Sequence, residues 1–218
     1  MPGVFIAGNS GAARECYWIL RDLQAASPGL SAYYEFGGFL SWRGYAGDLK
    51  ELSGFFRGPL EDHAVGADEL YIIGVGAPHL RRDIFRHLKE RGARLMNLIH
   101  PWTAICPSAV MGEGNVFQRG CTVYANAVIG DGNYINGAAN LSHDARIGDF
   151  NFLAPYAIVL GGASMGDGNH LGPHAVLLEH ARMGSGNLLT PGSVLYKGSG
   201  DNARLSGNPA LKIGAMEN

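Results

Sequence analysis

The chain has 218 residues, of which 46% are hydrophobic and 17% charged, and its net charge is −2 at pH 7. This length fits one large domain or two small ones, and the composition is that of a folded protein, not a disordered one. The near-neutral charge, with no run of Lys or Arg, argues against a nucleic-acid surface.

The three cysteines, Cys16, Cys106 and Cys121, have no C-x-x-C spacing. This argues against a disulfide or zinc framework and fits a reducing cytoplasm. The opening residues MPGVFIAGNSG lack the basic start and long apolar run of a signal peptide. No stretch reaches the roughly eighteen apolar residues of a membrane span. We therefore expect a cytoplasmic protein with no membrane partner.

The first hundred residues alternate short apolar runs with helical patterns. The runs predict buried strands and the patterns predict helices. The strands are expected at 4–8, 69–76 and 93–101, and the helices at 9–23 and 78–92. This order predicts a small parallel, Rossmann-like α/β domain over residues 1–100.

After Pro101 the pattern changes to a strict repeat. Every sixth residue from Ile105 to Leu195 is large and apolar, and the residue four positions after each is small. The motifs GEGN, GDGN, GDFN, GDGN and GSGN begin every eighteen residues from 112 to 184. Three hexads per recurrence predict a triangular prism of parallel strands, about five coils long, over residues 101–218.

The prism assigns a place to each repeated residue. Large residues fill the interior, small residues fit the corners, glycines permit positive φ, and the asparagines stack as a hydrogen-bonded ladder. A sandwich or an up-and-down barrel would explain neither the six-residue nor the eighteen-residue repeat.

Residues eighteen apart lie above one another in such a prism, about 4.8 Å per coil. One column therefore contains Ala125, His143, Gly161 and Glu179. Asp144 could orient the imidazole, and a glycine one coil away leaves its backbone N–H open. This arrangement suits general-base acyl transfer. The alternative is that His143 is only a solvated surface residue.

His170, His174 and His180 raise a second possibility, because γ-class carbonic anhydrases bind a metal through histidines on this prism. The six-residue spacing puts His174 and His180 on different faces, and His170 has another hexad phase. We expect no metal, although a site shared between subunits stays open.

The segments LSHDARIGDF, LIHPWTAICPSAVMGEGNV and SGNPALKI resemble the sialic acid O-acetyltransferase-like sugar acyltransferase family. That family includes enzymes that N-acetylate nucleotide-linked 4-amino-sugars in polysaccharide biosynthesis. The resemblance runs nearly end to end. It implies a nucleotide-binding α/β domain, a left-handed β-helix, and a homotrimer with acetyl-CoA between neighbouring prisms.

The resemblance also implies roles for single residues. His143 would be the catalytic base with Asp144 as its partner, and Gly161, with Gly162, would bind acetyl-CoA through the backbone. The substrate would be bound by Asn136 and by the glycine turn Gly8, Asn9, Ser10 and Gly11. Taken alone, that turn is equally well a tight strand-to-helix connection.

The chain departs from the family at several positions. Ala12 replaces a common His, Phe152 replaces a His near the thioester, and Ser41, Trp42 and Arg43 replace an acidic pair that reads a uracil-type base. Trp42 could stack on a base and Arg43 could meet a phosphate, or both could be surface residues. The acceptor need not be a UDP-linked sugar.

The expected function is acetyl-CoA-dependent acetylation of the amino group of a nucleotide-linked sugar. Two alternatives remain: O-acetylation of a sugar hydroxyl, and a non-catalytic β-helix that binds a nucleotide or an assembly partner. The sequence names neither the sugar nor the base.

Overall fold

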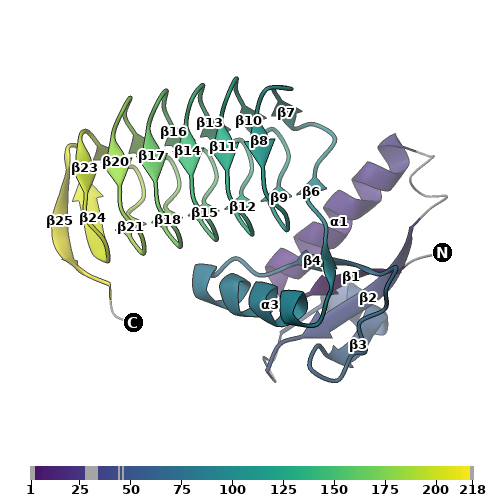
Figure 1. Cartoon of the computed structure of the whole chain (residues 1–218). Coiled ribbons are helices and arrows are strands. Elements are labelled where there is room, and N and C mark those ends of the chain that lie inside the picture. The colour runs from purple at the N-terminus through teal and green to yellow at the C-terminus, as the bar shows by residue number, and fades with distance from the viewer. Residues whose placement is uncertain (1–2, 28–33, 44, 46, 217–218) are drawn as a thin grey trace. The chain divides into compact units, whose positions relative to one another are not determined.

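The computed structural model describes residues 3–27, 34–43, 45 and 47–216. The chain divides into two compact units, Met1–Pro101 with Glu113–Val116, and Trp102–Gly112 with Phe117–Asn218. The first unit is built on a small parallel sheet and the second on stacked coils of short strands, as Figure 1 shows. This is the fold class expected from the sequence.

The first unit contains a five-stranded parallel sheet in the order β3-β2-β1-β4-β5. Its sequence patterns correctly indicated β1, α1, β4 and α3, whereas the single strand expected at 93–101 is two short strands, β5 and β6, and β2 and β3 were not indicated. The elements are β1 (Gly3–Ala7), α1 (Gly11–Ala26), β2 (Glu35–Ser41), η1 (Lys50–Phe55), β3 (Phe56–Pro59), β4 (Leu70–Ile73), α3 (Pro78–Glu90), β5 (Arg94–Leu95) and β6 (Leu98–Ile99).

The strand order reverses direction between β1 and β4. The chain moves from β1 outward through β2 to β3, and from β4 outward to β5. Right-handed crossovers then put α1 and α3 on opposite faces of the sheet. A crevice opens at the carboxyl ends of β1 and β4, which is where parallel α/β sheets bind ligands.

Neither α1 nor α3, nor any other helix in the described ranges, has the length and apolar content that a membrane span needs.

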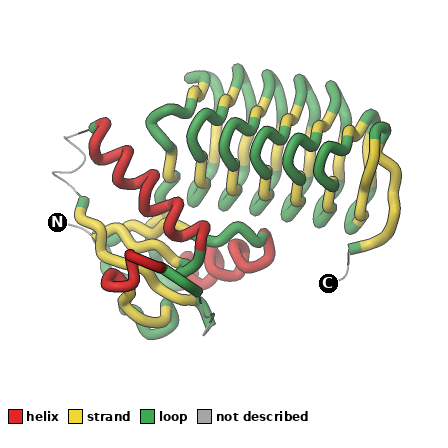
Figure 2. The backbone as a smooth tube through the Cα atoms, turned by 180° about the vertical axis from the view of Figure 1, so that it is seen from behind, coloured by secondary structure: helices red, strands yellow, loops and turns green. Residues whose placement is uncertain are grey.

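The second unit is a triangular prism whose faces are three sheets, and Figure 2 shows its short strands separated by turns. One sheet runs β7-β10-β13-β16-β19-β22, the second β8-β11-β14-β17-β20-β23, and the third continues from β9 through β12, β15, β18 and β21 to the hairpin β24-β25. The strands are β7 (Ala104–Ile105), β8 (Val110–Met111), β9 (Val116–Phe117), β10 (Thr122–Val123), β11 (Val128–Ile129), β12 (Tyr134–Ile135), β13 (Asn140–Leu141), β14 (Arg146–Ile147), β15 (Phe152–Leu153), β16 (Ile158–Val159), β17 (Ser164–Met165), β18 (His170–Leu171), β19 (Val176–Leu177), β20 (Arg182–Met183), β21 (Leu188–Leu189), β22 (Val194–Leu195), β23 (Gly198–Ser199), β24 (Ala203–Gly207) and β25 (Ala210–Ala215).

The second residue of each short strand points into the prism, and from β9 to β22 it is buried. Burial of each such side chain stabilises the unit by about 1.5–3 kcal/mol. Paired strands are in register at a spacing of eighteen, as in Thr122 with Asn140 and Asn140 with Ile158. The hexad therefore sets both the core and the coil-to-coil alignment.

The predicted asparagine ladder is confirmed. The side-chain oxygen of Asn133 accepts the amide N–H of Asn151 at 2.8 Å, and the same contact joins Asn151 to Asn169 and Asn169 to Asn187. These asparagines are buried, where water does not reach the backbone amides. Each side-chain oxygen therefore supplies the acceptor that a buried amide needs.

The two glycines of each GDGN motif have different roles. The second has positive φ, as predicted, for example +62° at Gly132 and +65° at Gly168. The first permits close approach instead, because a Cβ on Gly130 would overlap the side-chain oxygen of Asp149 in the next coil. That oxygen accepts the amide N–H of Asp131 at 2.8 Å.

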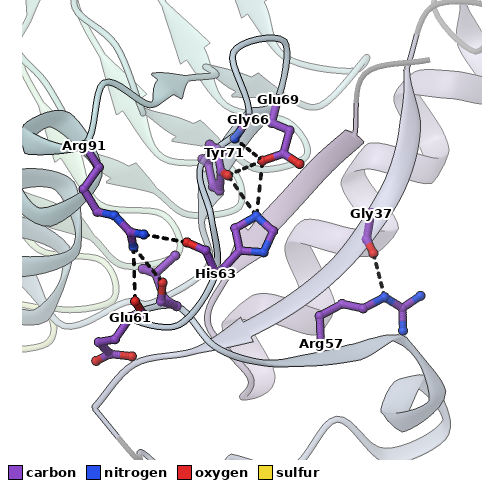
Figure 3. Close-up of polar contacts among 9 residues, drawn as sticks. Gly37, Arg57, Glu61, His63, Gly66, Glu69, Tyr71 and Arg91 are labelled. Atoms are coloured by element: carbon purple, nitrogen blue, oxygen red, sulfur yellow. Dashed lines mark hydrogen bonds and ion pairs between the residues drawn. The ribbon is translucent and has the colours of Figure 1, made fainter.

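In the first unit, polar side chains fix the loop between β3 and β4, as Figure 3 shows. The hydroxyl of Tyr71 donates to Oε2 of Glu69 at 2.5 Å, and His63 Nε2 lies 3.2 Å from the same oxygen. Arg91, which follows α3, donates to the carbonyls of Leu60 and His63 at 3.0 and 2.7 Å. The loop is thus tied both to the sheet and to the end of a helix.

Burial alone would raise the pKa of Glu69, but hydrogen bonds from Tyr71, the Gly66 amide and His63 outweigh it and hold that pKa below its ordinary value. A lowered carboxyl pKa stabilises the fold above the unfolded-state pKa, and this stability is lost as pH falls through the folded-state pKa. We predict that Glu69→Gln lowers the free energy of unfolding by about 1–3 kcal/mol at pH 7. Urea denaturation of both proteins at pH 7 and pH 3 should show this difference shrinking in acid. An equal difference at both values would contradict the assignment, and exposed Glu51→Gln is the control.

Replacing Asn151 by Ala should leave the buried amide of Asn169 without its acceptor. An unsatisfied buried N–H costs about 1–3 kcal/mol, so thermal denaturation should show a lower melting temperature. Arg146→Ala, an outward change on the neighbouring strand of the coil, should leave the melting temperature within about a degree of the parent. Equal melting curves for the two variants would show that the ladder adds no stability.

Candidate functional site

His143 and Asp144 form the corner between β13 and β14. The backbone at Asp144 has φ +59°, and its amide donates to the carbonyl of Ala125 one coil below at 2.9 Å. This left-handed turn directs both side chains outward, and they are 69% and 56% exposed. The repeat thus holds the imidazole beside the carboxylate without burying either group.

The imidazole is oriented by its neighbour. His143 Nδ1 lies 2.9 Å from Oδ2 of Asp144. Hydrogen bonds from His143 and then from Asn126 hold the pKa of the Asp144 carboxyl below its ordinary value. When Nδ1–H donates to this carboxylate, the lone pair lies on Nε2, as a general base requires.

Gly161 lies directly against this ring. A Cβ at that position would be 2.7 Å from both Cε1 and Nε2 of His143, so only glycine fits beside the imidazole as it is placed. The Gly161 amide has no hydrogen-bond partner among the described residues. By contrast, the Gly162 amide donates to the carbonyl of His143 at 3.0 Å. Of the two predicted glycines, Gly161 is therefore the one whose N–H can receive an oxyanion.

Gly162 leaves space in another direction. Its φ is +66°, and a Cβ there would be 2.5 Å from Nδ1 of His180 in the next coil. The two glycines therefore form a stretch of bare backbone between the imidazoles of His143 and His180.

The other histidines of the prism are dispersed. His174 lies at a different corner and stacks on Tyr156, with ring centroids 4.9 Å apart. His170 packs against Phe152, and burial lowers its pKa. Within the described ranges, no three His, Cys, Asp or Glu side chains are grouped as metal ligands.

A shallow hollow of about 510 Å³ extends from His143 across the face that contains β10, β13 and β16. Asn136, predicted to contact the acceptor, is not among its lining residues. Its side chain instead accepts the Gly137 amide at 3.3 Å, on the other side of the preceding corner. The hollow is lined by Thr122, Tyr124, Ala138, Asn140, Ser142, His143, Tyr156, Ile158, Leu160 and His174.

The glycine turn of the first unit follows β1. A Cβ on Gly8 would be 2.5 Å from the carbonyl oxygen of Gly74, and φ at Gly8 is +146°, so the close approach of β1 and β4 requires glycine there. Helix α1 begins at Gly11 with no side-chain cap from Ser10. Within the described part of the chain, the amides of Asn9, Ser10 and Gly11 have no acceptor. Free amides at a helix N-terminus bind anions.

A cavity of about 350 Å³ lies beside this turn. It contains Gly8, Asn9, Ser10 and Trp42 from the predicted set, but Gly11 is not among its lining residues. The remaining lining residues are Arg43, Tyr45, Val75, Gly76, Ala77, Leu80, Asp83 and Ile84.

Trp42 is a wall of this cavity and not a free surface residue. The residue is 6% exposed, its ring centre lies 5.0 Å from that of His87, and the Arg43 guanidinium lies 4.8 Å from the Trp42 ring centre. Arg43 itself lines the cavity, where a cation can meet a phosphate.

Another part of the lining comes from the loop after β4 and from α3. The sequence predicted these elements but did not indicate that their residues line a cavity. Buried Arg81 fixes this wall by donating to the carbonyls of Ile73, Val75 and Gly114 at 2.7, 2.8 and 3.1 Å. One signal was available: Leu80, Asp83 and Ile84 have the i, i+3, i+4 spacing of a single helix face.

No known family model matches the sequence, and no curated protein does. Solved structures do match. The chain is similar to a perosamine N-acetyltransferase from Caulobacter crescentus, solved with one histidine replaced by asparagine and in complex with CoA and GDP-perosamine, with a TM-score of 0.84, 25% identity and 98% of both chains covered. The acetyltransferase domain of PglB from Neisseria gonorrhoeae gives 0.83 at 25% identity, covering 98% of this chain and 100% of that one. WeeI from Acinetobacter baumannii gives 0.81 at 21% identity over the same shares.

These likenesses confirm the fold class, a small α/β domain followed by a left-handed β-helix. The likeness extends over nearly the whole chain, so both units are matched. The named activities among these neighbours are N-acetyl and acetyl transfer.

Proposed function

We propose that this protein is an acetyl-CoA-dependent N-acetyltransferase that acts on the amino group of a nucleotide-linked sugar. One observation supports this most strongly: the imidazole of His143 is held by Asp144 and packed on Gly161, whose amide is free among the described residues. Base and oxyanion donor thus adjoin one another, as acyl transfer requires.

The chemistry follows from these positions. His143 Nε2 takes a proton from the acceptor nitrogen as that nitrogen attacks the thioester carbonyl. The carbonyl oxygen becomes an oxyanion, which the Gly161 N–H stabilises by hydrogen bonding. The C–S bond then breaks, and the imidazolium returns its proton to the CoA thiolate. Asp144 stays ionised and stabilises the imidazolium.

The solved neighbours support both substrates. One is complexed with CoA and GDP-perosamine, and another with acetyl-CoA. In this chain, the amides of Asn9, Ser10 and Gly11, which have no acceptor within the described residues, suit a diphosphate. Acetyl-CoA and nucleotide-linked sugars are both cytoplasmic metabolites, which supports a cytoplasmic location.

We further propose a homotrimer in which prisms pack through the sheet that contains β16, β19 and β22. Outward residues on the later coils of this face are apolar, and Tyr196 beside them is 50% exposed. A contiguous apolar surface of this kind is typical of a subunit interface. The outward residues are Ile158, Leu160, Val176, Leu178 and Val194.

We predict that His143→Ala lowers kcat for acetyl transfer about 10²- to 10⁴-fold, because it removes the general base. Turnover is measured as free thiol released from acetyl-CoA in the presence of GDP- and UDP-linked 4-amino-sugars and their hydroxyl counterparts. His79→Ala, an exposed histidine on α3 outside both hollows, is the matched control.

Light scattering should give a trimer mass for the parent and both variants. Near-normal turnover in His143→Ala would refute its assignment as base. Turnover only with the hydroxyl counterparts would replace N-acetyl transfer by O-acetyl transfer.

Gly161→Ala tests the packing of the imidazole on the backbone. The new methyl group would lie 2.7 Å from the ring and must displace it, whereas the backbone at this position has no positive φ that would strain an alanine. We predict at least about a tenfold fall in kcat with an unchanged melting temperature. Gly200→Ala, where a Cβ meets nothing within 4 Å, should have no effect. Unchanged kcat in Gly161→Ala would show that the ring position is not needed.

A further inference from the structure

The cavity of the first unit has two kinds of wall. Leu80, Asp83 and Ile84 extend from one face of α3, and the Trp42 ring with Arg43 forms another wall. Apolar and aromatic walls around a few polar groups are typical of a site for a flat organic ring. The cavity volume of about 350 Å³ is within the range of small-molecule sites.

Asp83 supplies the carboxylate among the described lining residues, and this carboxylate is nearly free. Its recorded ion contact in the described ranges is with Nε of Arg82 at 3.9 Å, which is too long for a hydrogen bond, and no hydrogen bond reaches its oxygens. The side chain is 39% exposed. Both oxygens can therefore accept hydrogen bonds from a ligand.

Charge decides which part of a nucleotide would lie there. A diphosphate would be repelled by Asp83 and attracted to Arg43 and to the amides at the start of α1. The carboxylate instead needs a neutral donor, and the two oxygens can accept two parallel N–H bonds. The groups that suit a phosphate and the group that suits a hydrogen-bond donor are thus chemically distinct.

Guanine has the matching edge, because its ring N1–H and its 2-amino group are adjacent donors. Uracil has a single ring N–H flanked by two carbonyl oxygens, which a carboxylate repels. Adenine and cytosine have an amino group next to a ring acceptor. The carboxylate therefore discriminates among bases by donor pattern.

We propose that Asp83 selects a guanine nucleotide, so that the acceptor is a GDP-linked sugar. The base lies against Trp42 and Leu80, with its N1–H and 2-amino group donating to the two oxygens of Asp83. Ser41 and Trp42, at the end of β2, offer no carboxylate for this task. The inference rests on the proposed function only in taking the acceptor to be nucleotide-linked.

Calorimetric binding of GDP, IDP, UDP and ADP to the intact protein tests this without any acetyl transfer. IDP differs from GDP only in lacking the 2-amino group. We expect GDP to bind at least about tenfold more tightly than IDP and UDP, since a hydrogen bond to a charged group is lost. Asp83→Asn should reduce GDP affinity at least about tenfold while changing UDP affinity less than about twofold.

The matched control is Asp62→Asn, an exposed aspartate outside the cavity, which should leave all four affinities unchanged. Equal binding of GDP and UDP by the parent protein, or no nucleotide binding at all, would overturn the proposal. An equal loss of GDP and UDP affinity in Asp83→Asn would also overturn it, by assigning the carboxylate to the ribose hydroxyls. A GDP preference without thiol release from acetyl-CoA would refute the proposed function and leave the base assignment standing.

Discussion

Coil-on-coil hydrogen bonding sets the position of every outward side chain in the prism. Turn residues at the corners donate their amides to carbonyls nineteen positions earlier, as Asp144 does to Ala125, Gly162 to His143 and His180 to Gly161. The buried asparagine ladder joins residues eighteen positions apart, one coil to the next. Residues at one corner are therefore held in a vertical column, and the chemistry at a corner is determined by which side chains that column contains.

At the corner of His143, this column combines rigidity with access. The imidazole is exposed, but its orientation is fixed from two sides, by Asp144 beside it and by the Gly161 backbone above it. A base on a mobile loop would have to be ordered at each turnover, whereas a base on a stacked coil is already in place. Left-handed backbone at Asp144 is part of this arrangement, because it directs the carboxylate alongside the ring.

The repeat could be predicted from sequence because its hydrophobic and glycine periods depend only on neighbouring coils. The α/β unit was predicted less completely. Strands β2 and β3 were missed, since EFGGFLS contains two glycines that weaken a strand pattern. Asn136 was placed by resemblance alone, and its role as an acceptor contact stays a prediction. Neither the burial of Trp42 nor the approach of Asp83 could be predicted, because both depend on packing between segments far apart in sequence. The sequence also could not show whether Gly161 or Gly162 has an amide without a partner among the described residues, because that depends on the backbone hydrogen bonds of the folded chain.

The most direct test is a crystal structure of the protein grown with CoA and GDP. The central claim is that the corner formed by His143 and Gly161 receives the thioester. The account predicts the CoA sulfur within hydrogen-bonding reach of the His143 imidazole, beside the bare backbone of Gly161. CoA bound at another corner, with no thiol near His143, would contradict it.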